Sequence, residues 1–89
     1  MSAIFESVIK TLPNGRWYIE LRDIEGDREA ECLSVEDFAK LLEEWGADYG
    51  HDVNVTWSQE DNVSELQVHE VRMEMMAYEQ KMNEEGGDL

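Results

Sequence analysis

Cysteine and long apolar runs are scarce in this chain, and each scarcity excludes a class of protein. Cys32 is the only cysteine, so no internal disulfide can form. No apolar run approaches the roughly 20 residues that a membrane helix needs. The opening residues, MSAIFESVIK, lack the basic and long apolar segments of a signal peptide. We therefore expect a cytoplasmic protein in a reducing compartment, with no membrane association.

Basic residues are also scarce. Seven Lys and Arg stand against 22 Asp and Glu, which gives a formal net charge of −15. A small soluble domain usually carries a net charge of about 2–8 in magnitude. Nucleic-acid binding and binding to anionic membranes both need a basic patch, whereas the seven cations of this chain are scattered singly. We therefore expect no direct contact with nucleic acid.

The first third of the chain predicts three antiparallel strands. Residues 4–12 are rich in β-branched and aromatic side chains, and Asn14-Gly15 is typical of a tight hairpin turn. Residues 16–23 alternate, with Trp17 and Ile19 on the apolar side. A second turn at 25–27 leads to a third strand at 28–33. The central segment 53–57 alternates as well and predicts a fourth strand.

Helical periodicity appears in two segments. Ser34 is a good N-cap for a helix at 34–46, and Ser58 can cap a second helix at about 59–85. The sequence thus predicts an α+β fold with the order β-β-β-α-β-α, in which two helices pack on a largely antiparallel sheet. We expect one domain at 1–85 and a flexible C-terminal tail at 86–89. The predicted core includes Trp17, Ile19, Phe38, Leu41, Trp57, Val71 and Met75.

The stretch DIEGDREAE carries a carboxylate at every second position. These five residues are Asp23, Glu25, Asp27, Glu29 and Glu31. The stretch does not fit a calcium-binding EF-hand loop, because its glycine is the fourth residue rather than the sixth. One interpretation is a solvated hairpin tip whose charges discourage aggregation. The other is a partner-binding acidic surface, to which Glu36, Glu43 and Glu44 of the first helix would contribute.

Catalytic and metal-binding patterns are weak. Cys32 falls inside a predicted strand and has no basic neighbour in the sequence that would activate its thiol. His51 and His69 lack the spaced partners of a zinc site. We therefore expect no enzyme activity, no catalytic residue, no metal site and no cofactor.

The last helix is apolar on two sides. Val68, Val71, Met75, Tyr78 and Met82 follow a 3-4 spacing and predict the side that packs on the sheet. Leu66, Met73 and Ala77 lie nearly opposite, with Met76 on the flank. This second stripe is either a set of scattered surface residues or a contact face for a partner or a weak homodimer.

In size, charge and compact mixed fold, the chain resembles the small acidic inhibitors that phages encode against host nucleases. These are anti-CRISPR and anti-restriction proteins, and some of them mimic DNA. The resemblance includes no residue motif, so it assigns no site. It implies a non-enzymatic inhibitor that binds a protein with a basic, nucleic-acid-binding surface. The alternative is a structural or assembly protein that oligomerises through the last helix, with its charge serving solubility.

Overall fold

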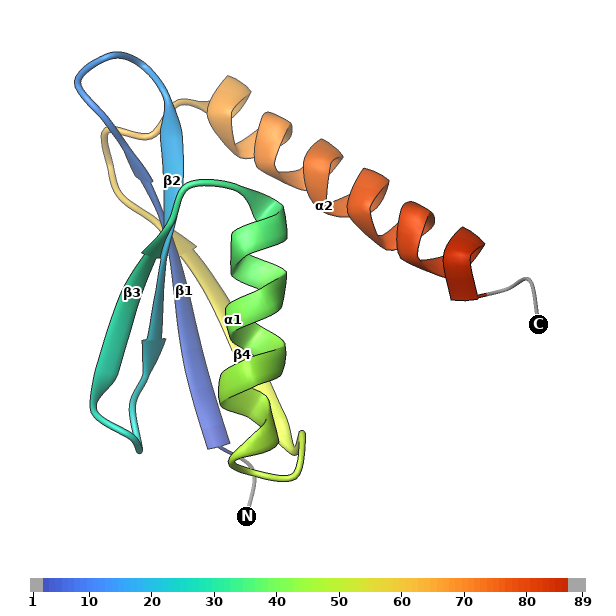
Figure 1. The fold of residues 1–89 in the computed structure, drawn as a ribbon. Coiled ribbons are helices and arrows are strands. Elements are labelled where there is room, and N and C mark those ends of the chain that lie inside the picture. Colours follow the sequence, from blue (N-terminus) through green and yellow to red (C-terminus); the bar gives the residue numbers. More distant parts are fainter. Residues whose placement is uncertain (1–2, 87–89) are drawn as a thin grey trace.

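The computed structural model describes residues 3–86, with side chains up to residue 81. It has the predicted element order. The strands are β1 (Ala3–Thr11), β2 (Trp17–Asp23), β3 (Arg28–Cys32) and β4 (Val53–Gln59), and the helices are α1 (Val35–Ala47) and α2 (Glu65–Gly86). The predicted α+β class is confirmed (Figure 1). The predicted tail lies outside the described residues, except that Gly86 is the last residue of α2.

The four strands form one sheet in the order β3-β2-β1-β4. The β1–β2 and β2–β3 pairs are antiparallel, as expected, whereas β4 pairs with β1 in parallel. The parallel pair follows from the connection through α1. A helix that crosses the sheet returns the chain to the end where β3 began, so β4 runs in the direction of β3 and β1.

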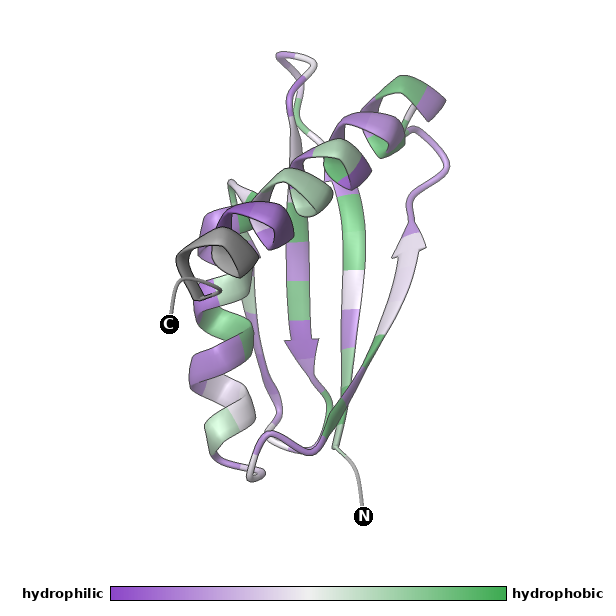
Figure 2. Ribbon diagram, turned by 90° about the vertical axis from the view of Figure 1, so that its right-hand side faces the viewer, coloured by the Kyte–Doolittle hydropathy of each residue, from purple (hydrophilic) through white to green (hydrophobic). Residues whose placement is uncertain are grey.

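Both helices lie on the same face of the sheet (Figure 2). Strand residues on this inner face are apolar and buried, among them Phe5, Ile19, Leu21 and Cys32. The opposite, outer face of the sheet carries polar and charged side chains such as Glu20. The period of two along each strand explains this division, because successive side chains point to opposite faces.

Each helix begins at a serine cap. The Ser34 Oγ accepts a hydrogen bond from the Asp37 backbone N–H at 3.1 Å, as predicted for α1. The start predicted for α2 was wrong, because β4 continues through Gln59 and takes up Ser58. Ser64 caps α2 instead, in a reciprocal pair with Gln67 three residues later. The Gln67 side-chain amide also donates a hydrogen bond to Thr11 Oγ1 at 2.8 Å. This bond links the start of α2 to the end of β1.

Helix α2 touches the sheet near its start and then leaves it (Figures 1 and 2). Of the predicted core, Ile19, Phe38 and Val71 are buried, and Trp17, Leu41 and Met75 are half-buried. Trp57 was predicted to be buried but is 43% exposed, because α2 does not cover the inner face of β4. The radius of gyration is 13.8 Å. A compact domain of this length would have a radius of gyration of about 12 Å.

One carboxylate is buried among its partners. Asp23 is 1% exposed and accepts hydrogen bonds from Arg28 Nε at 2.8 Å, the Tyr49 hydroxyl at 2.9 Å and the Gly26 backbone N–H at 3.0 Å. Gly26 must remain a glycine, because a Cβ there would collide with the Asp23 carboxylate. Arg28 also pairs with Asp48 at 2.8 Å and lies over the Trp45 ring. Asp23 and Arg28 thus join the β2–β3 turn to the end of α1.

This network lowers the pKa of Asp23. Burial opposes ionisation, but the bonds from Gly26, Tyr49 and Arg28 together outweigh it. A carboxyl whose pKa is lower in the folded state stabilises the fold above its unfolded pKa of about 3.9. That contribution is lost as the pH falls through the lowered folded value.

We expect Asp23→Asn to lower the free energy of unfolding by about 3 kcal/mol at neutral pH, since Arg28 would lose its buried partner. The difference between wild type and variant should shrink below about pH 4. Urea titrations at neutral and acidic pH measure both effects. Asp27→Asn, an exposed change in the same turn, is the matched control and should leave stability nearly unchanged. Equal stability of wild type and Asp23→Asn at neutral pH would contradict this role.

Candidate functional site

The acidic stretch does not form one surface. Asp23 was predicted to belong to the acidic partner surface, and this placement was wrong because its carboxylate points inward. Because of the turn between β2 and β3, the carboxylates before and after it do not point to the same face of the sheet. Glu25 and Asp27 are exposed in that turn, while Glu29 and Glu31 lie on the outer face of β3. Four of the five carboxylates are therefore accessible to a partner.

The outer face of the sheet contains an ion-pair cluster. Glu20 bonds to Lys10 on β1 and to Arg22 Nε at 3.0 Å, and Arg22 also lies 3.8 Å from Glu29. The hydrogen bond from Lys10, followed by that from Arg22, lowers the pKa of Glu20, and the same bond to Glu20 raises the pKa of Lys10. In the β2–β3 register Glu20 faces Glu31. The two cations offset the repulsion between these two carboxylates.

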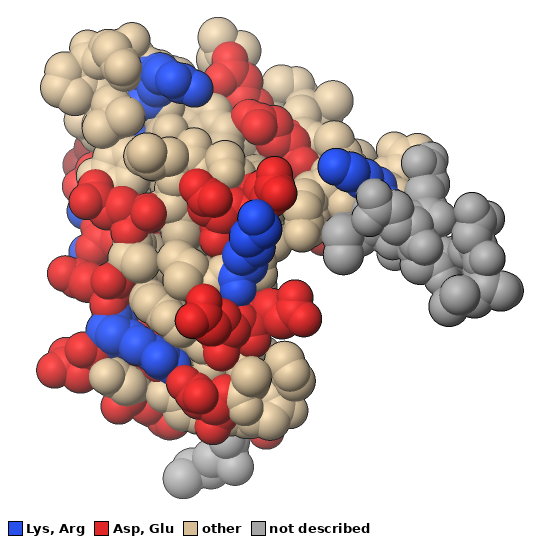
Figure 3. Space-filling model, viewed as in Figure 1, with Lys and Arg blue, Asp and Glu red and all other residues tan. Residues whose placement is uncertain are grey.

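The exposed side of α1 is acidic as well, although α1 lies on the opposite face of the sheet from Glu29 and Glu31. Glu36, Glu43 and Glu44 are all exposed, and Lys40 lies 3.4 Å from Glu36. In Figure 3, acidic side chains spread over α1 and the neighbouring sheet edge, with single basic side chains between them. Arg28, on β3, reaches Asp48 at the end of α1, so strand and helix lie side by side here.

We call the exposed acids of both layers around the β3 edge the acidic side. It consists of Glu25, Asp27, Glu29, Glu31, Glu36, Glu43 and Glu44. Within residues 3–81, no lysine or arginine side chain lies within 4.0 Å of the carboxylates of Glu25, Asp27, Glu31, Glu43 and Glu44. The nearby cations are already paired with other acids. The acidic side therefore presents uncompensated negative charge on a strand and a helix that are held together.

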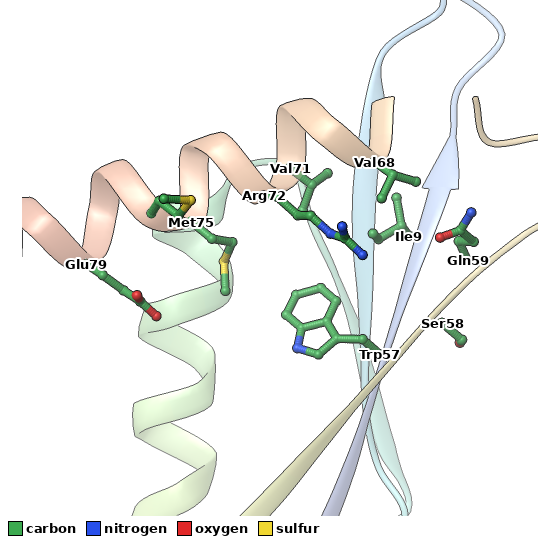
Figure 4. A pocket seen from close by; sticks show the side chains of 10 residues that line it. Ile9, Trp57, Ser58, Gln59, Val68, Val71, Arg72, Met75 and Glu79 are labelled. Carbon is green, nitrogen blue, oxygen red and sulfur yellow. The ribbon is translucent and has the colours of Figure 1, made fainter. Parts of the chain in front are cut away.

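A second candidate site is an apolar groove of about 480 Å³ between α2 and β4. Trp57 lies on its β4 side, and Val71, Met75 and Met76 come from α2. Figure 4 shows the Arg72 and Met75 side chains directed from the helix into the groove above Trp57. The sequence pattern did not predict this groove, because it assigned Trp57 and Met75 to a core that α2 would close.

The predicted second stripe of α2 is exposed. Leu66, Met73 and Met76 are 66%, 52% and 64% exposed, and Ala77 is exposed as well. The four residues do not share one surface, however. Met76 lines the groove, whereas the lining of the groove does not include the other three.

The groups with catalytic potential are dispersed. Cys32 is buried with a free thiol. His51 and His69 are both exposed, one in the turn between α1 and β4 and the other in α2. Among residues 3–81 there is no group of three or more His, Cys, Asp or Glu arranged to hold a metal ion. None of the described helices is long and apolar enough to cross a membrane.

Comparisons with known proteins give no match to a family model, a curated protein or a solved structure.

We expect the Cys32 thiol to be unreactive in the folded protein. Burial, together with the nearby charge of Asp37, raises its pKa to about 11. Because the thiolate is the reactive form, labelling with an aromatic disulfide at mildly alkaline pH should be about a hundredfold slower, or more, in native buffer than in urea. Absorbance of the released thiol measures the rate. Fast labelling in native buffer would show that the thiol is accessible.

Proposed function

We propose that this domain is a non-enzymatic inhibitor whose acidic side binds the basic, nucleic-acid-binding surface of a partner protein. The supporting observation is the charge of the acidic side, where five of the seven exposed carboxylates have no lysine or arginine within 4.0 Å among residues 3–81. Self-repulsion of such a surface costs stability, and a basic partner relieves it.

The arrangement suits electrostatic recognition. Glu29 and Glu31 stand on one strand at alternate positions, about 6.6–6.8 Å apart along it. The ion pairs of Arg28 with Asp23 and Asp48 hold this strand against α1, so a partner need not order the two acidic elements on binding. Long-range attraction between a net charge of −15 and a basic surface also accelerates encounter.

This mode of action is that of the phage anti-CRISPR and anti-restriction inhibitors, some of which mimic DNA. Size, acidity and a small mixed fold support the assignment. A cytoplasmic nuclease or nucleic-acid-binding complex is the proposed partner. The inhibitor would exclude nucleic acid by occupying its binding surface, so it needs no catalytic group and no cofactor of its own.

The test neutralises four exposed acids together, as Glu25→Gln, Asp27→Asn, Glu29→Gln and Glu31→Gln. We expect this variant to remain folded, because Asp23 is untouched, and to lose partners that the wild type captures from a bacterial lysate at low salt. Purified captured partners should bind nucleic acid, and duplex DNA or RNA should compete with the wild-type domain. Affinity should fall steeply as ionic strength rises.

A matched control removes four acids elsewhere, as Glu60→Gln in the loop before α2 and Glu65→Gln, Glu70→Gln and Glu74→Gln on α2. It lowers the net negative charge by the same amount as the test variant but leaves the acidic side intact. Equal loss of binding in both variants would mean that only net charge matters. Captured partners that nucleic acid does not displace would refute the proposal.

The alternative function is a structural or assembly protein that oligomerises through the last helix. Its support is the exposure of Leu66, Met73 and Met76. Ionic strength separates the two functions, because apolar self-association of a highly charged chain strengthens when salt screens its repulsion. Met73→Glu should then abolish assembly without affecting capture of a basic partner.

A further inference from the structure

The groove between α2 and β4 leaves large apolar side chains in contact with water. Trp57 on β4 is 43% exposed and Met76 on α2 is 64% exposed, and both line the groove. Tryptophan and methionine are enriched at protein–protein interfaces. The groove is therefore a candidate contact surface.

The residues on the side of α2 that faces the groove are regularly spaced. Val68, Arg72, Met75 and Glu79 recur at intervals of three or four residues and all line the groove, as does Met76. The stripe thus has two adjacent methionines at its centre. One cation lies before them and one anion after them, seven residues or about 10 Å apart along the axis.

The charges and methionines on this side of α2 complement those of a second α2 that runs antiparallel to it. Suppose that a second α2 runs antiparallel to the first and that a two-fold axis passes between Met75 and Met76. Each residue then faces the residue of the partner subunit for which the two residue numbers add up to 151. Met75 then meets Met76 of the partner subunit, and Arg72 meets Glu79 of the partner subunit. The symmetry forms both contacts twice. Within residues 3–81, neither Arg72 nor Glu79 has an ion pair of its own.

We propose that the occupant of the groove is a second copy of this chain. The α2 helices of the two copies pack antiparallel, each against the groove of the other. Met75 and Met76 form the centre of the interface above Trp57, and two Arg72–Glu79 pairs close its ends. This interface differs from one through the outer stripe with Leu66 and Met73, and it does not depend on the proposed inhibitor function.

The distribution of charge favours a second copy at this place. Strand β4, which borders the groove, contains no charged residue, whereas β3 at the other edge of the sheet carries Arg28, Glu29 and Glu31. Glu70 and Glu74 point away from the groove stripe at 100° per residue. A dimer through the groove therefore keeps the acidic side of each copy remote from the interface. The residual repulsion between two chains of −15 makes the dimer weak.

Charge reversal tests the proposed contact. Arg72→Glu and Glu79→Arg should each weaken dimerisation about tenfold or more, since two attractive contacts become repulsive. Mixing the two variants should restore the dimer. In the mixed pair, the two glutamates of the first variant face the two arginines of the second. Analytical ultracentrifugation at physiological ionic strength measures the mass of each sample and of the mixture.

Glu74→Arg is the matched control, because it makes the same change of charge as Glu79→Arg on the opposite side of α2. It should leave the dimer intact, and circular dichroism should show all variants folded. A monomeric wild type at millimolar concentration would overturn the proposal. A dimer that neither single charge reversal weakens would also overturn the proposal. It would indicate a different surface, such as the second stripe with Leu66 and Met73. Failure of the mixture to associate would overturn it as well.

Discussion

The buried carboxylate of Asp23 is the constraint on which the acidic half of the molecule depends. A lone charge in an apolar interior is too costly to keep, so the chain surrounds this one with donors from a turn, a strand and the segment after α1. Arg28 is central because it also reaches Asp48 and covers Trp45. The β2–β3 hairpin and the end of α1 are thereby joined at one point, and their orientation fixes which acids face solvent.

The few cations of the chain also determine the charge of its surface. Lys10, Arg22, Arg28 and Lys40 each pair with an acid of their own chain. These pairs lie between neighbouring strands, between the hairpin and α1, or along α1, where local repulsion would otherwise be strong. Consequently little positive charge remains near the acidic side. A chain with a net charge of −15 can fold because its few cations stabilise contacts between elements, but its surface stays strongly negative.

The two edges of the sheet have different properties. The β3 edge is short and charged, which discourages pairing with other strands and leaves the carboxylates of Glu29 and Glu31 exposed. The β4 edge is uncharged and rich in β-branched residues, and the groove beside it contains Trp57 and two methionines. A basic partner at the first edge and a second copy at the second would not compete for space.

Local pattern determined most of the fold. The alternation in β2, the Ser34 cap and the helical spacing of α1 and α2 depend on neighbours within a few residues, and these elements were predicted correctly except for the start of α2. The exposure of Glu25, Asp27, Glu43 and Glu44 also followed from sequence, because unpaired charges remain in water. The net charge of −15 predicts no direct nucleic-acid binding, because a nucleic-acid binder needs a basic patch.

Only the tertiary structure decided the remaining points, because each depends on residues far apart in the chain. Asp23 is buried since Tyr49, 26 positions later, donates to it, and alternation alone could not reveal that partner. The parallel pairing of β4 with β1 depends on where α1 crosses the sheet. The angle at which α2 leaves the sheet opens a groove at Trp57. An apolar periodicity identifies the side of a helix that packs, but the direction of that helix is set by what it packs against.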